Sequence, residues 1–408
     1  MRAHQRPGCD TRRVRVLPES EPVVGTRGWA DWNESLEQRY TLGMEEEVML
    51  LERPSLTLAQ CNTVVIDAVS EPMGARLKVE THASVVEYAT RVHRSVRGAA
   101  IELSGLRRAL ALELAPLGLA GAVAGTHPLG RWDGNRVSDA ERYRRLGQSM
   151  RSLLEGPPTM GLHVHVGVPN PEDAVRLLNT FRAAAPLLLA LGANSPFCQG
   201  RDGGLCSERT LLLERFPRSG LPRRYRSYAD YVLAIDGLIA AGAFQDPTYL
   251  WWDVRLQPAL GTVEVRVMDG QSQLAESAAL AALVQSMARL ELEEGAVAVE
   301  VCPELLRENR FIAARDGMDA ALIASGGNRT QVRLLVEVLL DRCRPHAVAL
   351  GCADELERVA ALAERTGADR QREWLDETRR FSEVSARLAG CFTDAADLPR
   401  RPQRFQPK

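Results

Sequence analysis

The sequence predicts an α+β fold rather than a doubly wound parallel sheet. Short strand-like runs alternate with helical stretches between about Tyr40 and Asp269, and the chain after Gln271 is almost wholly helical. Strands that gather in one part of a chain and helices in another are typical of α+β proteins. The chain has 408 residues, 45% of them hydrophobic, which is enough for the core of one large or two modest domains.

Four strand-like segments place charged or imidazole side chains on one face. The side chains of a strand alternate between its two faces, so residues i and i+2 lie on the same side. The segments are LGMEEEVML, GLHVHVGV, WWDVRLQP and GTVEVRVMD, and a fifth, KVETHASVVEYAT, adds two carboxylates. The side chains concerned are Glu45 with Glu47, His163 with His165, Asp253 with Arg255, Glu264 with Arg266, and Glu80 and Glu87 of the fifth segment.

Helices are predicted where apolar residues recur at spacings of three to four. Two such stretches, SVRGAAIELSGLRRALALELA and PEDAVRLLNTFRAAAPLLLALGA, lie among the strands. The predicted helices after Gln271 are LAESAALAALVQSMARLELEEG, DGMDAALIAS, QVRLLVEVLLDRC and ADELERVAALAER.

The two ends of the chain differ from its middle. Residues 1–36 are polar, rich in Arg, Pro and Glu, and lack periodicity, which predicts a flexible N-terminal extension with order beginning near Tyr40. We expect a single domain over residues 37–395 and a C-terminal tail over residues 396–408.

Composition excludes several classes of function. A formal net charge of −2 gives no overall basic field, so no nucleic-acid partner is expected. No apolar run is predicted to approach the length required to span a bilayer, and no apolar segment follows the basic N-terminus, so we expect no membrane partner and a cytoplasmic location. The eight cysteines form no CxxC pair and are expected to be reduced and mostly structural.

Lysine is nearly absent, since Lys78 is the only one before Lys408. A P-loop that ends in GK[ST] is therefore excluded, and a pyridoxal enzyme would have to use Lys78 for its Schiff base. Any nucleotide phosphate must then be held mainly by metal ions and arginine.

The polar faces of the five segments have an unusual content. A polar strand face is most often exposed to solvent, but these faces hold carboxylates, imidazoles and guanidiniums. On one concave surface the carboxylates would repel each other unless cations lay between them, and carboxylate and imidazole ligands suit Mg²⁺ or Mn²⁺. With arginines beside them, these groups match phosphoryl transfer from ATP to a substrate carboxylate, after which an amine attacks the acyl phosphate.

The same segments resemble the glutamate–cysteine ligase type 2 family, the bacterial carboxylate–amine ligases. The resemblance runs through TLGMEEEVML, VETHASVVEYAT, GTHPLGRW, GLHVHVGVP, LGANSPFCQGRDGGLCSER, YLWWDVRLQPALGTVEVRVMD, ENRFIAARDGMDA and GADRQR, over most of residues 40 to 390. It implies a glutamine-synthetase-like fold, in which an antiparallel sheet curves into a funnel with helices packed outside. It also implies one ligase domain that uses metal-bound ATP, an amino-acid carboxylate and an amine.

The resemblance implies roles for single residues. Arg266 would face the phosphates, and Arg209 and Arg255 are candidates for holding the substrate carboxylate or the γ-phosphate. The resemblance also implies metal binding by Glu45, Glu47, Glu87, His163 and Glu264, and Glu80 matches a neighbouring acidic position. The sequence leaves His165 open as either a second ligand or a neighbour with a buried hydrogen bond.

Other motif positions are more open. Thr126 and His127 of GTHP and Asn194 of LGAN are candidates for substrate binding, although a structural turn explains His127 equally well. The loop QGRDGG is interpreted as a mobile substrate loop rather than a phosphate cradle. At least one of the adjacent Trp251 and Trp252 is expected in the core.

Two rival functions and several details stay open. A metal-dependent amidohydrolase would use the HVH pair, but it needs further histidines and only His346 follows. The second rival is a non-catalytic relative that binds an amino acid or nucleotide. Departures from the family pattern at Asp202-Gly203-Gly204, Cys206 and KVETHAS leave the acceptor pocket and the product undetermined, and a homodimer is one option for the assembly.

Overall fold

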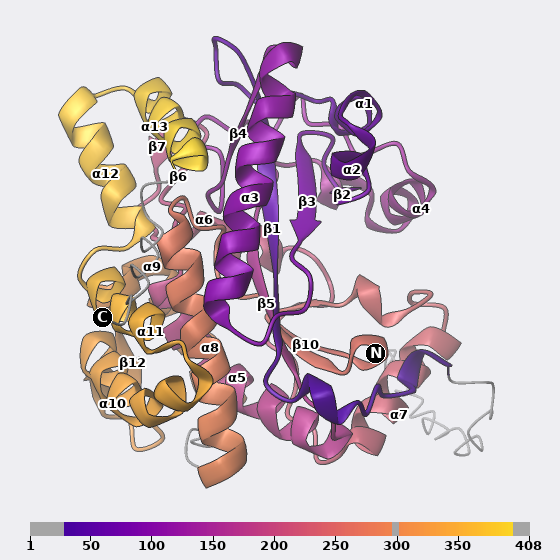
Figure 1. The fold of residues 1–408 in the computed structure, drawn as a ribbon, viewed down its shortest axis with the longest axis vertical. Helices are drawn as coiled ribbons and strands as arrows, with labels where there is room; N and C mark the ends of the chain where they lie inside the picture. Colours follow the sequence, from indigo (N-terminus) through magenta and orange to yellow (C-terminus); the bar gives the residue numbers. More distant parts are fainter. Residues whose placement is uncertain (1–27, 296–301, 395–408) are drawn as a thin grey trace, which may run out of the picture.

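The computed structural model describes residues 28–295 and 302–394 (Figure 1). Within them, seven strands form one sheet in the order β10-β11-β5-β1-β3-β2, with β4 also paired to β1. Every pairing in this sheet is antiparallel, as predicted. The strands are β1 (Leu42–Glu52), β2 (Leu77–Val79), β3 (Val85–Ala89), β4 (Leu119–Ala122), β5 (Leu162–Gly167), β10 (Val254–Gln257) and β11 (Thr262–Val265).

Three long helices cover the apolar face of this sheet: α3 (Val96–Leu114), α5 (Pro171–Leu191) and α8 (Leu274–Glu294). The starts of α3 and α5 are capped by side chains. The Ser95 hydroxyl accepts a hydrogen bond from the amide of Gly98, and the Asn170 side chain accepts from the amides of Glu172 and Asp173.

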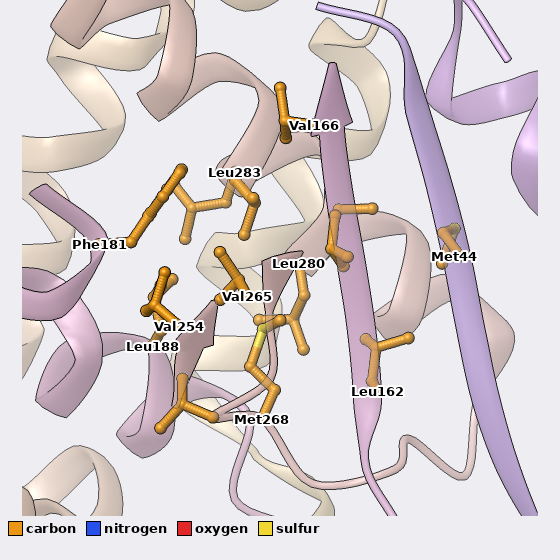
Figure 2. Close-up of a cluster of buried hydrophobic side chains, with 14 of the residues drawn as sticks. Met44, Leu162, Val166, Phe181, Leu188, Val254, Val265, Met268, Leu280 and Leu283 are labelled. Atoms are coloured by element: carbon orange, nitrogen blue, oxygen red, sulfur yellow. The ribbon is translucent and has the colours of Figure 1, made fainter. Parts of the chain in front are cut away.

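The main core lies between these helices and the sheet. Figure 2 shows Met44 of β1 and Leu162 and Val166 of β5 beside side chains of α5 and α8, among them Phe181 and Leu280. These side chains are at most 1% exposed. Because apolar residues alternate along the strands, one face of the sheet packs in the core and most of the polar side chains lie on the opposite face.

Smaller elements surround this core, and the C-terminal part is mostly helical. The remaining α-helices are α1 (Asn62–Ala68), α2 (Glu71–Gly74), α4 (Glu141–Met150), α6 (Glu208–Glu214), α7 (Tyr228–Ala240), α9 (Pro303–Asp316), α10 (Val332–Leu350), α11 (Ala353–Glu364), α12 (Gly367–Thr378) and α13 (Phe381–Thr393). The short strands are β6 (Phe197–Cys198), β7 (Arg201–Asp202), β8 (Ser219–Gly220), β9 (Trp251–Trp252), β12 (Ala321–Ile323) and β13 (Arg329–Gln331).

One predicted helix is wrong. The segment DGMDAALIAS forms a 3₁₀ turn at Gly317–Asp319 and then β12, which pairs with β13. Gly317 ends α9 at a φ of 56°, and the side chain of Asn309 exchanges hydrogen bonds with the amide and carbonyl of Ile323 at 2.7 and 2.9 Å. These long-range partners select an extended backbone that local apolar spacing cannot reveal.

The ends of the chain are only partly described. Residues 1–27 of the predicted extension and the predicted tail lie outside the described residues. Residues 28–36 are described, and there the indole of Trp29 donates to Asp236 at 3.0 Å and that of Trp32 to the Val168 carbonyl at 2.8 Å. Packing against the domain therefore begins upstream of the expected start near Tyr40.

Helix α5 corrects the statement that no segment has the length and apolarity to span a bilayer. By length and composition it passes that test, but 78% of its apolar window is buried inside the protein. Its apolar character is explained by its central position in the core.

Candidate active site

Strand β1 presents consecutive glutamates to opposite faces of the sheet. Glu46 is fully buried on the helix side, where Arg107 Nε and the Tyr88 hydroxyl each donate to its Oε2 at 2.8 Å. Glu45 and Glu47 take the other face and line a cavity there. The predicted sharing of a face by Glu45 and Glu47 is confirmed.

Strand register places the predicted site residues next to one another. Glu45 lies directly opposite His163 of β5, and Glu264 of β11 lies opposite His165. On the other side of β1, Glu47 lies opposite Glu87 of β3. Side chains opposite each other in neighbouring antiparallel strands are close enough to interact. Residues far apart in sequence are therefore brought together by sheet pairing.

The cavity on this face has a volume of about 650 Å³ and charged walls. Acidic, basic and apolar side chains all contribute to its lining. The acidic ones include Glu45, Glu47, Glu80 and Glu87, the basic ones include Lys78, Arg142, Arg209, Arg255 and Arg266, and the apolar ones include Leu146, Leu154, Leu213, Phe216, Trp251 and Trp252.

Carboxylates and imidazoles come together in three overlapping groups. Within each group, one ligand atom from every member lies within 4.8 Å of the others. The groups share members, so they form one continuous cluster rather than separate sites. They are Glu45 with Glu87 and His163, Glu45 with His165 and Glu264, and Glu47 with Glu80 and Glu87.

Crowding of buried carboxylates shifts their protonation. Burial, followed by the charges of Glu87 and Glu47, raises the pKa of Glu80 well above its ordinary value. Burial likewise raises the pKa of Glu47 and of Glu87, and the charge of Glu45 adds to the effect on both. Like charges in a low-dielectric site favour the neutral acid unless a cation is present.

Two other carboxylates are held in the charged form. Burial opposes ionisation of Glu45, but the imidazoles of His163 and His165, whose ring nitrogens lie 3.4 and 3.6 Å from its carboxylate oxygens, keep its pKa well below the usual range. Burial also opposes ionisation of Glu264, and the positive charges of Arg255 and Arg266 outweigh it and lower the pKa.

The two histidines leave ring nitrogens without a protein partner. The Nε2 atoms of His163 and His165 are buried and accept or donate no hydrogen bond among the described residues. Burial, followed by the charge of Arg266, lowers the pKa of His163 to about 4, which favours a neutral ring that can bind a metal. Unpartnered imidazole nitrogens beside several carboxylates fit a divalent cation with oxygen and nitrogen ligands.

The three predicted arginines have different surroundings. Arg266 contacts Glu264, and its Nη1 lies 3.3 Å from His163 Nδ1. Arg255 donates to both oxygens of Glu264 and, through Nη1, to the carbonyls of Thr248 and Leu250. Arg209 donates to the carbonyls of Arg266 and Val267, at the end of β11, while its Nε has no partner among the described residues.

The predicted substrate residues Thr126, His127 and Asn194 are not among the described residues that line the cavity. The Thr126 hydroxyl donates to the Phe197 carbonyl at 2.7 Å. Asn194 donates to the Gly270 carbonyl at 2.7 Å and to Ser272 at 2.9 Å. Both side chains satisfy buried backbone or hydroxyl groups.

His127 corresponds to the structural alternative considered for it. Its Nδ1 accepts from the Leu129 amide at 3.1 Å and its Nε2 lies 2.8 Å from the Leu56 carbonyl, so both ring nitrogens are used. Burial lowers its pKa to about 4.

The QGRDGG segment, Asp253 and the two adjacent tryptophans have surroundings that the sequence did not predict. The QGRDGG segment contains β7, which pairs with β6 in a hairpin whose turn is Gln199 and Gly200, and Arg372 of α12 binds Asp202. Asp253 is paired with Arg310 of α9 at 2.6 Å. Trp251 and Trp252 are both half-buried and both line the cavity, so neither belongs to the fully buried core.

Lys78, Gln257 and Tyr143 are among the cavity residues that escaped prediction. Lys78 was notable only as a rare residue type, yet its ammonium lies 3.1 Å from Glu87. Gln257 donates to Glu264 at 2.7 Å and shares a strand face with Arg255, so the i+2 pattern could have identified it. Tyr143 of α4 gave no such signal.

Comparison with known proteins decides the family. A sequence model of glutamate–cysteine ligase family 2 matches residues 41–388. The chain belongs to this family. A provisionally named glutamate–cysteine ligase 2-1 of Rubrobacter xylanophilus is 38% identical over 352 residues, which cover 86% of this chain and 94% of the relative. A provisionally named glutamate–cysteine ligase 2 of Sorangium cellulosum is 37% identical over 356 residues, with 86% and 95% covered.

Solved structures show the same fold at low identity. The glutamate–cysteine ligase of Francisella tularensis, solved in complex with AMP, has a TM-score of 0.62 and 15% identity, with 88% of this chain and 90% of that chain covered. A bifunctional glutathione synthetase of Pasteurella multocida has a TM-score of 0.63 and 12% identity, with 86% of this chain and 52% of that chain covered. Family 2 membership and the glutamine-synthetase-like α+β fold inferred from sequence are therefore confirmed, and a family of ligases does not favour the amidohydrolase alternative.

Proposed function

We propose that this family 2 member is an ATP-dependent carboxylate–amine ligase that forms an acyl phosphate and then an amide. The observation that supports it most is the continuous cluster of carboxylates and imidazoles beside one cavity. Glu45, Glu47, Glu80, Glu87 and His165 of the cluster line this cavity with Arg209, Arg255 and Arg266, whereas His163 and Glu264 are buried behind them. Phosphoryl transfer works mainly by positioning and by neutralising charge, and this cavity supplies both kinds of group.

Divalent cations, Mg²⁺ or Mn²⁺, would be held by the carboxylate and imidazole cluster. When bound, they would neutralise the charge of the triphosphate. The residues that would hold them are Glu45, Glu47, Glu87, His163 and Glu264, with Glu80 and His165 as further ligands.

The contacts of the three arginines support a different role for each. The charges of Glu264 and Glu47 raise the pKa of Arg266 despite its burial, so its guanidinium stays charged and would stabilise the transferring phosphoryl group. Arg255 uses its donors on Glu264 and two carbonyls, so it would position Glu264. Arg209 retains an unpartnered Nε and would reach the substrate carboxylate.

The reaction balances with the groups named. A carboxylate oxygen of the substrate attacks the γ-phosphorus of ATP, and the bond to the bridging β–γ oxygen breaks to release ADP. The amine nitrogen then attacks the acyl carbon, phosphate leaves with the carbon–oxygen bonding pair, and the nitrogen loses a proton. Arg266 stays beside the phosphoryl oxygens through the first step and screens their charge.

The relatives' names indicate the substrates to try first. We propose the side-chain carboxylate of glutamate as the acid, and cysteine as one of several amines, because departures near KVETHAS and Cys206 alter the surroundings of the site. We further propose a cytoplasmic enzyme without nucleic-acid or membrane partners, with a homodimer as its assembly.

An ADP-release screen tests this function. The pure protein, Mg²⁺ and ATP are mixed with glutamate or another amino acid and a panel of amines, and products are identified by mass. We expect ADP and an amide in equal amounts for at least one pair, and none for Glu45→Gln. Binding of Mg·ATP without ADP formation from any mixture would favour the non-catalytic alternative, and ATP-independent hydrolysis with retained zinc would favour the amidohydrolase.

A further inference from the structure

Lys78 is a cation at the acidic end of the cavity that the proposed reaction does not use. It lies on edge strand β2 directly opposite Glu87, and its Nζ is 3.1 Å from Glu87 Oε1 and 4.0 Å from Glu45 Oε1. Both glutamates belong to the group with His163 that has metal-ligand spacing. A metal cation bound by these two carboxylates would therefore lie next to the Lys78 ammonium.

The side chain of Lys78 is free to leave this position. It is 61% exposed, whereas Glu87 is 9% and Glu45 18% exposed. An ammonium on a four-carbon stem can turn into solvent at small cost, while the strand-held carboxylates cannot follow it. Arg255 and Arg266 differ in this respect, because Arg255 is buried, Arg266 is only 14% exposed, and both are held on Glu264 at the other side of the cluster.

We propose that Lys78 is a built-in counter-ion that exchanges with a divalent cation. Without metal, its ammonium screens Glu87 and Glu45 from each other. A free cation entering there must displace a positive charge, so it binds weakly. A cation that arrives with a nucleotide brings phosphate oxygens for Lys78 to contact, so the residue makes the site favour the nucleotide–metal complex over the free ion. This inference rests on the proposed function.

The test measures metal binding without nucleotide and therefore does not depend on turnover. Free Mn²⁺ is titrated into metal-free wild type, Lys78→Met and Lys78→Arg, and bound ion is measured by electron paramagnetic resonance. Lys78→Met removes the attraction between the ammonium and the two carboxylates, which an entering ion must break in wild type. A pair of unit charges about 4 Å apart corresponds to roughly a fivefold gain in Mn²⁺ affinity, even at the dielectric constant of water. Lys78→Arg should stay near wild type because it keeps the charge.

Thermal unfolding provides a second test of whether Lys78 acts as a counter-ion that the metal replaces or only as a packing contact. Metal-free Lys78→Met should melt at a lower temperature than wild type, and saturating Mn²⁺ should remove the difference. Arg91→Met is the matched control, since Arg91 is 80% exposed and pairs with Glu102 outside the cluster. It should leave the Mn²⁺ affinity unchanged.

The outcomes distinguish this inference from the proposed function. Equal or weaker Mn²⁺ binding by Lys78→Met, with saturable binding by wild type, overturns the counter-ion role and leaves the metal site standing. Absence of saturable Mn²⁺ binding in both proteins overturns the metal site and, with it, the role of Lys78.

Discussion

Arg255 and Glu264 are direct cross-strand partners of β10 and β11, and the guanidinium holds the carboxylate at two points. Arg255 Nε lies 3.0 Å from Glu264 Oε2 and Nη2 lies 3.2 Å from Oε1. Gln257 adds a third donor at 2.7 Å. Glu264 is thus oriented by the sheet itself before any ligand arrives.

Arg255→Lys should lower turnover at least tenfold, because an ammonium keeps the charge but cannot reproduce the planar fork or the bonds to the Thr248 and Leu250 carbonyls. Arg255→Met should destabilise the fold by about 3–5 kcal/mol by leaving Glu264 buried without a full partner. ADP release and urea unfolding measure the two effects. Arg142→Lys, at a cavity arginine bound to Thr248, is the control and should change both little. Normal turnover in Arg255→Lys would refute the orienting role.

His127→Gln should reduce stability rather than catalysis. The substitution removes the paired contacts to the Leu129 amide and Leu56 carbonyl, and an unsatisfied buried group costs about 1–3 kcal/mol. Unfolding free energy and kcat/KM per folded molecule are the measurements. A higher KM at unchanged stability would instead support a substrate contact.

The contribution of Glu80 to the stability of the metal-free protein should fall as pH rises above about 4.5. The folded-state pKa of Glu80 is raised above its unfolded value, so its contribution is present below about pH 4.5 and is lost as pH passes through the folded value. Glu80→Gln should make the dependence of melting temperature on pH flatter in EDTA, and Mg²⁺ should restore wild-type stability at pH 8. Parallel pH profiles for both proteins would contradict this.

The buried pair of Glu46 and Arg107 should matter for folding. Arg107→Met should cost about 3–5 kcal/mol, because it leaves a carboxylate at 0% exposure without its partner. The double variant Glu46→Leu with Arg107→Met should be more stable than Arg107→Met alone. Arg344→Met, which breaks an exposed pair with Glu357, should cost about 1 kcal/mol or less. The free energies of unfolding in urea of wild type, Arg107→Met, the double variant and Arg344→Met test this prediction.

Local alternation was enough to predict which side of β1 faces the site. Glu45 and Glu47 were assigned to one face of β1 because the side-chain period of a strand is two. The same rule puts Glu46 on the core face, but its need for Arg107 could not be foreseen, since the partner lies 61 residues away on α3. Which glutamates lie opposite each other depends on the register between neighbouring strands, and the sequence of one strand does not specify that register.

Motif position was a weaker guide for buried polar residues. Asn194 and Thr126 lie in stretches that match the family, and the sequence could not separate a ligand contact from a buried hydrogen bond because both need a polar side chain. The short apolar run in DGMDAALIAS fits a helix or a strand equally well. Its extended backbone is selected by the hydrogen bond to Asn309 and by pairing with β13, which the run itself does not reveal.

The central claim is that the carboxylate and imidazole cluster holds divalent cations for a nucleotide. Calorimetric titration of a non-hydrolysable ATP analogue tests it without knowledge of the acid or amine. Wild type should bind the analogue with Mg²⁺ and at least tenfold more weakly in EDTA, while Glu45→Gln should lose most of the Mg²⁺-dependent gain. Equal affinity with and without Mg²⁺, or an unchanged gain in Glu45→Gln, would contradict the claim.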